Sequence, residues 1–191
     1  MDSSKLEQYD AFLVDRDGTI VSTCTSNYLA YQSTLEDFGI SVNFDFFSEF
    51  HAGRSWPMIA SKHFPDLDAT TISAISKAKG LRFVDYISSL SWNIDLIHFL
   101  ENKRWYLISN GSIESSIQIF NSYPGQNGPL VVVAPNSLNM PKPSPDMYLE
   151  TIKKYSLNIN NSIAIEDSDD GVISAETAGL TVLRIPHFCI N

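Results

Sequence analysis

The sequence predicts an α/β protein, with a parallel sheet at its core and a helical segment inserted after the first strand. Two observations predict this class. Short apolar runs alternate with helix-like segments over the second half of the chain. A similar run stands near the start, and the stretch from Ser22 to Leu90, which has helical periodicity, separates it from the others.

Five apolar runs rich in Val, Ile and aromatic residues are expected to be buried strands. Helix-like segments follow three of them, and this order favours right-handed crossovers and a Rossmann-like sheet with helices on both faces. The expected strands are Ala11–Val14, Trp105–Ile108, Leu130–Ala134, Ser162–Ile165 and Thr181–Ile185. The expected helices are 112–123, 145–155 and 171–178, with Ser144 as N-cap and Pro145 as first residue of the second, and Gly179 closing the third.

The inserted stretch carries enough aromatic residues to pack as a small helical subdomain. They are Phe46, Phe47, Phe50, Trp56, Phe64, Phe83 and Tyr86. The sequence therefore predicts a core formed by residues 1–21 and 91–191, and a helical cap of residues 22–90 that sits over the sheet.

Composition limits the classes of partner. The 191 residues are 43% hydrophobic, which is enough for a proper core. The net charge of −9, from 22 acidic and 13 basic residues, argues against a broad nucleic-acid-binding surface. A small phosphorylated metabolite remains compatible with this charge if a divalent cation and one or two basic groups neutralise it locally.

The remaining bulk features indicate a monomeric cytoplasmic protein without a membrane span. No apolar stretch approaches the length of a transmembrane helix, and the start is polar. Cys24 and Cys189 are far apart in sequence and are expected to be free thiols. The four histidines show no metal-ligand spacing, so none is given a role.

Polar residues collect where the expected strands end. The segments are Asp15-Arg16-Asp17-Gly18-Thr19, Ser109-Asn110-Gly111-Ser112, Pro141-Lys142-Pro143 and Glu166-Asp167-Ser168. Ligands of open parallel sheets bind beyond the carboxyl ends of the strands, so these segments are expected to form one site.

These four segments, in this order, resemble the haloacid dehalogenase-like superfamily, in its capped phosphatase and β-phosphoglucomutase-like branch. The resemblance covers nearly the whole chain. It implies a Mg²⁺-dependent phosphatase that hydrolyses small phosphate monoesters, such as a sugar phosphate, through an aspartyl-phosphate intermediate.

The resemblance also implies a role for each acidic residue. Asp15 is the nucleophile, and Asp17 protonates the leaving oxygen and then deprotonates the attacking water. The Mg²⁺ ligands are Asp15, the backbone carbonyl of Asp17, and Asp167, with Glu166 in support of the metal site. Glu166 and Asp167 also suit the start of a helix, whose positive end favours acids.

Four further positions match the phosphate-binding part of the family pattern. The resemblance implies that Ser109 donates its hydroxyl to a phosphate oxygen, that Asn110 and Gly111 present backbone N–H groups, and that Lys142 supplies positive charge. Three of these residues also have a plain alternative, since Ser109 and Asn110 suit a helix cap and Lys142 suits a solvated loop. Arg54 either reaches the substrate or is an exposed arginine.

Two other functions stay open. A β-phosphoglucomutase-like enzyme uses the same core, but the histidine that it carries in the early cap is absent from Ser26-Asn27-Tyr28. A non-catalytic phosphate-binding protein keeps the fold without turnover. Arg16, Ser22-Thr23 and Ser91-Trp92 depart from common family residues and leave the subfamily, and so the substrate, open.

Overall fold

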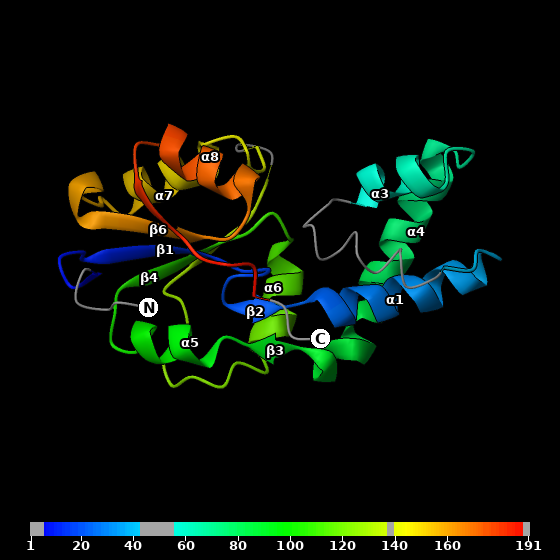
Figure 1. Ribbon diagram of the computed structural model, residues 1–191, viewed down its shortest axis with the longest axis horizontal. Helices are drawn as coiled ribbons and strands as arrows, with labels where there is room; N and C mark the ends of the chain where they lie inside the picture. The colour runs from blue at the N-terminus through cyan, green and yellow to red at the C-terminus, as the bar shows by residue number, and fades with distance from the viewer. Residues whose placement is uncertain (1–5, 43–55, 137–139, 189–191) are drawn as a thin grey trace. The chain divides into compact units, whose positions relative to one another are not determined.

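The structure, a computed structural model, describes residues 6–42, 56–136 and 140–188 (Figure 1). The chain divides into two compact units. One contains the chain up to Val21 together with Trp92–Phe188, and the other is built from Ser22–Ser91. Two short strands, β2 (Val21–Ser22) and β3 (Ser91–Trp92), pair where the chain passes from one unit to the other and back.

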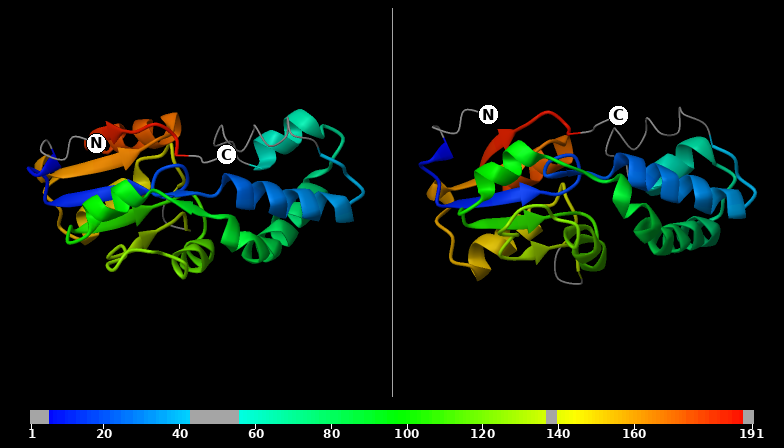
Figure 2. Two further views of the ribbon diagram at one scale, coloured as in Figure 1. Left: turned by 60° about the horizontal axis from the view of Figure 1, so that its bottom comes forward. Right: turned by 90° about the horizontal axis from the view of Figure 1, so that it is seen from below.

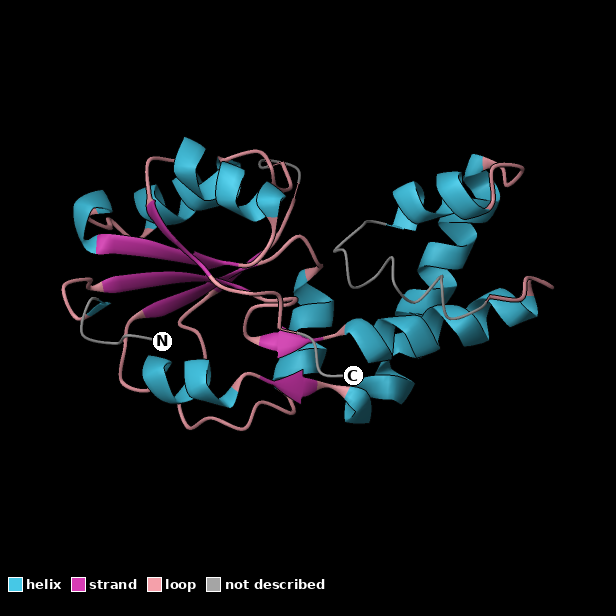
Figure 3. Cartoon of the chain, in the orientation of Figure 1, coloured by secondary structure: helices cyan, strands magenta, loops and turns pink. Residues whose placement is uncertain are grey.

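Long strands of the first unit lie side by side in magenta in Figure 3. The whole sheet of this unit has five parallel strands in the order β5-β4-β1-β6-β7. This order confirms the α/β class and the parallel Rossmann-like sheet. The strands are β1 (Ala11–Asp15), β4 (Trp105–Ile108), β5 (Val132–Val133), β6 (Ser162–Glu166) and β7 (Thr181–Arg184).

Helices cover both faces of this sheet because alternate side chains of each strand point to opposite sides. Leu13 packs in one cluster with Tyr148 and Ala175, which belong to α7 (Asp146–Lys154) and α8 (Asp169–Thr177). On the other side, Phe12 meets Phe99 of α5 (Ile94–Leu100) with ring centroids 5.3 Å apart. Trp105 is 6.2 Å from Phe120 of α6 (Ile113–Phe120). Accordingly, α7 and α8 lie above the strands in Figure 1, and α5 lies in front of them when seen from below (Figure 2).

The register of the central strands sets the position of the site. Asp15 lies opposite Ile108, and Val14 lies opposite Ile165. The residues that end β1 and β6, and the residue that follows β4, therefore reach the same edge of the sheet. Asp15, Ser109 and Glu166 occupy those positions.

The boundaries differ from the sequence prediction where local signals are weak. β5 is only Val132–Val133, and β7 stops at Arg184. α7 begins at Asp146 with Pro145 in the cap position, so the assignment of Ser144 as N-cap is wrong. Proline suits either position, because it has no N–H to leave unpaired and its φ is preset. α5, β2 and β3 were not predicted, whereas Gly179 closes α8 with φ 86° as expected.

The second unit is helical, with its own apolar core. It contains α1 (Cys24–Asp37), α3 (Trp56–His63), α4 (Ala69–Arg82) and the 3-10 helix η2 (Phe83–Ser89). Its buried cluster includes Tyr31 stacked on Trp56 at 4.8 Å between ring centroids. Asp68 caps α4 by accepting a hydrogen bond from the backbone N–H of Thr71. The predicted core residues Phe46, Phe47 and Phe50 lie outside the described residues.

Two bulk expectations can be compared with the structure. Cys24 is buried and is not part of a disulfide, while Cys189 lies outside the described residues. Among the described helices, none has the length and apolarity needed to cross a lipid bilayer.

Candidate active site

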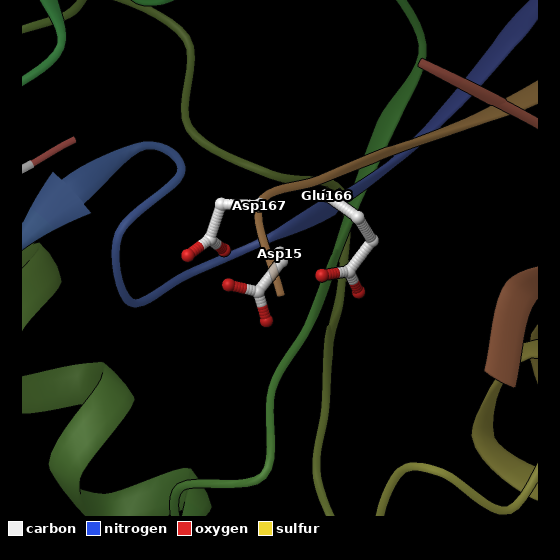
Figure 4. Close-up of side chains that lie close together, drawn as sticks. All are labelled: Asp15, Glu166 and Asp167. Carbon is white, nitrogen blue, oxygen red and sulfur yellow. The ribbon is translucent and has the colours of Figure 1, made fainter. Parts of the chain in front are cut away.

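Three carboxylates gather at the carboxyl edge of the sheet (Figure 4). Asp15 is the last residue of β1, Glu166 is the last residue of β6, and Asp167 follows it. Each contributes an oxygen atom, and these atoms lie within 4.8 Å of one another. All three residues are buried, and Glu166 is fully so. Negative charges at such short distances in a buried site repel one another strongly, so the cluster needs a positive charge.

Lys142 supplies part of that charge from the loop between β5 and α7. Its Nζ lies 2.6 Å from Asp15 Oδ1 and 2.5 Å from Glu166 Oε1, and it donates to the Ile108 carbonyl at 2.8 Å. Burial lowers the pKa of Lys142, but Asp15 and Glu166 outweigh burial and hold the pKa above its usual value. The ammonium is therefore charged, and the interpretation of Lys142 as a solvated loop lysine is wrong.

Burial raises the pKa of the Asp15 carboxyl well above its usual value. Lys142 acts in the opposite direction, and the nearby Glu166, Asp167 and Asp17 raise the pKa further. One lysine thus does not balance the acids around Asp15.

Glu166 is held from two sides. Its Oε1 accepts hydrogen bonds from Lys142 Nζ and from the Tyr148 hydroxyl. Its Oε2 is buried and has no hydrogen-bond partner in the part of the chain that the structure describes. A Cβ atom on Gly171 would lie 2.0 Å from that oxygen, so α8 approaches the carboxylate as closely as only glycine permits.

Asp167 is oriented by one hydrogen bond on each oxygen. Thr19 Oγ1 donates to Oδ1 at 2.8 Å, and Nδ1 of His187 lies 2.5 Å from Oδ2. This hydrogen bond raises the pKa of His187. His187 follows β7 in a segment whose Phe188 N–H donates to the Gly18 carbonyl.

Asp17 lies apart from the carboxylate cluster and is paired with Arg16. Arg16 Nε and Nη2 lie 2.9 and 2.7 Å from Asp17 Oδ2. The Asp17 side chain is 38% exposed, in contrast to the buried acids. The next residue, Gly18, has φ 82°, which turns the chain in a conformation that side chains disfavour.

The segment after β4 joins the site through Asn110. Its side chain donates to the Lys142 carbonyl at 3.2 Å and accepts from the Lys142 N–H at 2.8 Å, which fixes the lysine loop. Ser109 is buried, and its Oγ accepts from the Gly111 N–H at 3.0 Å. Ser112, rather than Ser109 or Asn110, caps α6 by accepting from the Ser115 N–H. Ser109 and Asn110 are therefore placed for a role other than helix capping.

Comparison with known proteins assigns the chain to a family. The haloacid dehalogenase-like hydrolase family matches residues 12–185, which is most of the sequence. The chain belongs to this hydrolase family. The resemblance inferred from the four strand-end segments is thereby confirmed.

Among curated proteins, two sugar-phosphate phosphatases resemble this haloacid dehalogenase-like hydrolase over most of its length. Fructose-1-phosphate phosphatase YqaB of Escherichia coli (strain K12) is 22% identical over 185 residues, which cover 94% of this chain and 97% of that protein. 2-Deoxyglucose-6-phosphate phosphatase 2 of Saccharomyces cerevisiae is 24% identical over 197 residues, which cover 92% of this chain and 79% of that protein.

Solved structures share the fold. CbbY of Rhodobacter sphaeroides, crystallised with xylulose-1,5-bisphosphate, superposes with a TM-score of 0.77 at 22% identity, covering 94% of this chain and 87% of that one. A β-phosphoglucomutase from Clostridium difficile gives 0.69 at 18% identity, covering 92% and 84%. At these sequence identities, the structural similarity is evidence for a shared fold alone.

The donor set of this hydrolase fits a divalent metal ion. Three buried carboxyl groups outnumber the one lysine that contacts them, and the buried Glu166 Oε2 is unpaired among the described residues. Carboxylate oxygens are the ligands that Mg²⁺ prefers.

Several residues that shape the site were not singled out from the sequence. Tyr148 and His187 hold Glu166 and Asp167, and Arg16 was noted only as a departure from the family pattern. The contacts of Tyr148 and His187 with these acids, and those of Arg16 with Ser115 and Ser116, join positions far apart in the chain, for which periodicity carries no signal. Arg54, a candidate substrate contact, lies outside the described residues.

Proposed function

We propose that the chain is a Mg²⁺-dependent phosphatase that hydrolyses small phosphate monoesters, of the sugar phosphate class, through an aspartyl-phosphate on Asp15. The observation that carries this proposal is the Asp15 carboxylate, which shares a buried site with Lys142 and two further acids at the carboxyl edge of the sheet. The substrate class rests on the two sugar-phosphate phosphatases to which the chain is similar. Residues 22–90 are proposed as the cap that selects the substrate.

In the first step, an Asp15 carboxylate oxygen attacks phosphorus. An O–P bond to Asp15 forms while the ester P–O bond breaks, and the departing oxygen takes a proton from Asp17. The products are the free alcohol and a phosphorylated Asp15, with Asp17 left as a carboxylate.

In the second step, Asp17 removes a proton from a water molecule as the water oxygen attacks the phosphorus of the aspartyl-phosphate. The bond between phosphorus and Asp15 breaks, which releases inorganic phosphate. Asp15 is again a carboxylate and Asp17 is again protonated, so the cycle closes.

Charge neutralisation is the main requirement of both steps, because an anionic carboxylate must approach an anionic phosphate. Mg²⁺, when bound by Asp15, Asp167 and the backbone carbonyl of Asp17 with support from Glu166, supplies Lewis-acid charge compensation. Lys142 adds a fixed positive charge 2.6 Å from the nucleophile. The Ser109 hydroxyl and the Asn110 N–H bind the phosphoryl oxygens, while the Gly111 N–H donates to Ser109 Oγ.

The test is phosphate release from p-nitrophenyl phosphate and from a panel of sugar phosphates, fructose 1-phosphate among them, with Mg²⁺ present. We expect turnover that EDTA abolishes and that Asp15→Asn abolishes without unfolding the protein. Asp10→Asn serves as the matched control, because Asp10 is an exposed carboxylate that precedes the same strand. Turnover by Asp15→Asn would reject the nucleophile.

The same experiment separates the two other functions. ³¹P NMR of a sugar phosphate incubation distinguishes inorganic phosphate, the expected product, from an isomeric sugar phosphate, which would indicate a mutase. Mg²⁺ binding without turnover on the whole panel would indicate a phosphate-binding protein instead.

A further inference from the structure

Arg16 is a buried cation that joins two parts of the site. It stands between Asp15 and Asp17 in sequence, and its side chain is only 7% exposed. Its Nη1 donates to Ser115 Oγ at 2.9 Å and to Ser116 Oγ at 2.7 Å, both in the first turns of α6. Nε and Nη2 contact Asp17 Oδ2. The guanidinium therefore spans from the strand-end loop to the helix that follows Ser109.

Neighbouring atoms leave little space around the Arg16 guanidinium. A Cβ atom on Gly111 would lie 2.1 Å from Arg16 Nη2, so the segment after β4 leaves room for the guanidinium only because residue 111 is glycine. The planar group is thus held at one end by two serine hydroxyls and along one side by the backbone of Gly111. A planar fork of donors fixed in this way can orient a carboxylate with little loss of entropy.

The contacts of Arg16 divide by charge. The two serines are neutral acceptors, and the ion pair is made with Asp17. An oxygen of a neutral carboxyl group also accepts hydrogen bonds, so the contacts of Arg16 to Oδ2 favour one arrangement of Asp17 whether its carboxyl group is ionised or protonated. Without Arg16, the Asp17 side chain, which is 38% exposed, loses the contacts to Oδ2 that join it to α6.

We infer that Arg16 is a positioning residue for Asp17, which it holds in a fixed place relative to α6 and the segment Ser109-Gly111. The inference rests on the proposed function, in which Asp17 is the proton donor and acceptor. It goes further, because it names the residue that keeps the proton donor, Asp17, in position relative to the phosphoryl site.

The inference has a specific chemical consequence. An alkyl phosphate, such as a sugar phosphate, needs a proton on its leaving oxygen, whereas p-nitrophenolate departs without one. Loss of the contacts between Arg16 and Asp17 therefore slows the first step for the alkyl ester. For p-nitrophenyl phosphate the rate of this step should change little. General loss of structure would slow both substrates alike.

The experiment measures kcat/KM of Arg16→Met on both esters with Mg²⁺ present. This ratio reports the steps up to departure of the leaving group. We expect a fall of about 100-fold for the alkyl phosphate, the cost of a small misplacement of a reacting group, and little change for p-nitrophenyl phosphate. Arg104→Met, at an exposed arginine of the same unit, should change neither value.

A double-mutant cycle gives the second readout. In an Asp17→Asn background, Arg16→Met should cause no further fall on the alkyl phosphate, because the residue acts through Asp17. If Arg16→Met does not fold, the double variant Ser115→Ala/Ser116→Ala removes the contacts of Arg16 at its other end and should give the same dependence on the leaving group, with a smaller fall.

Equal falls on both esters, additive effects in the cycle, or a raised KM without dependence on the leaving group would each overturn the inference. These outcomes require an active wild type. Absence of wild-type turnover on both esters would instead reject the proposed function, and the inference with it, so the two failures are distinguishable.

Discussion

At the scale of single residues, the carboxylate cluster depends on Lys142 for its charge balance. Lys142→Met leaves Asp15, Glu166 and Asp167 without the ammonium that contacts two of them. Breaking a buried ion pair by removing one partner costs about 3 to 5 kcal/mol, and we expect a loss of this size in the metal-free protein. Denaturant unfolding with EDTA and with Mg²⁺ measures it, and Mg²⁺ should recover part of the loss.

Lys153→Met is the matched control, because Lys153 is an exposed lysine of α7. It should leave the unfolding free energy nearly unchanged. A Lys142→Met protein as stable as the wild type in EDTA would contradict the view that this lysine stabilises the buried carboxyl cluster.

Asp15 makes the stability of the metal-free protein depend on pH. Its pKa is raised in the folded state, mainly by burial, above the ordinary value of 3.8. Its contribution to stability is therefore fully present below the unfolded pKa and is lost as the pH rises through the folded pKa. Neutral Asn escapes this loss, so Asp15→Asn should gain stability relative to wild type as the pH is raised in EDTA. Thermal unfolding over a pH series checks the sign, and a constant difference would count against it.

At the scale of elements, replacing two helical glycines by alanine should have opposite effects on the stability of the protein. Gly80 lies in α4, where an added Cβ atom would meet nothing within 4 Å. Gly80→Ala should therefore raise the unfolding free energy by about 0.5 to 1 kcal/mol, the usual gain of alanine over glycine in a helix. Gly171 lies in α8, where the Cβ atom would fall 2.0 Å from Glu166 Oε2.

Gly171→Ala should accordingly destabilise the protein and weaken Mg²⁺ binding, because either α8 or the Glu166 carboxylate must move. Calorimetric titration with Mg²⁺ alone measures the binding, and Gly80→Ala is the control that should bind normally. Normal binding by Gly171→Ala would mean that Glu166 shifts without consequence for the metal.

The helices and strands also differ in how accurately the sequence predicts their presence and bounds. β1, β4 and β6 were predicted to within one residue, because continuous apolar runs with β-branched and aromatic residues suit strands buried on both faces. The strand expected at Leu130–Ala134 is shorter because it is at the sheet edge, where one neighbouring strand supports it. The helix α5 was missed, since its seven residues offer too few turns for periodicity.

At the scale of the whole molecule, the two units have separate apolar cores. Ile75 is fully buried in the cluster of the second unit, which shares no residue with the cluster around Leu13. Ile75→Ala should lower the unfolding free energy by about 2 to 5 kcal/mol. Leu81→Ala, at a leucine that is 72% exposed in the same helix, should have little effect.

Below its unfolding temperature, Ile75→Ala should bind Mg²⁺ with wild-type affinity, because every proposed ligand belongs to the first unit. Calorimetric titration checks this expectation. A large loss of Mg²⁺ affinity would indicate that the carboxylate cluster depends on the packing of the helical unit.

The sequence by itself determined the fold class, the family and the side chains that meet at the sheet edge. Apolar runs and the polar residues that end them are local signals, and parallel pairing brings those ends together whatever the loops do. The catalytic and metal-binding roles of Asp15, Asp17 and Asp167 stay predictions. Tertiary structure alone decided that Tyr148 and His187 hold Glu166 and Asp167, and that Arg16 reaches Ser115 and Ser116 of α6. Contacts of this kind depend on how separate elements pack, and no spacing along the chain encodes them.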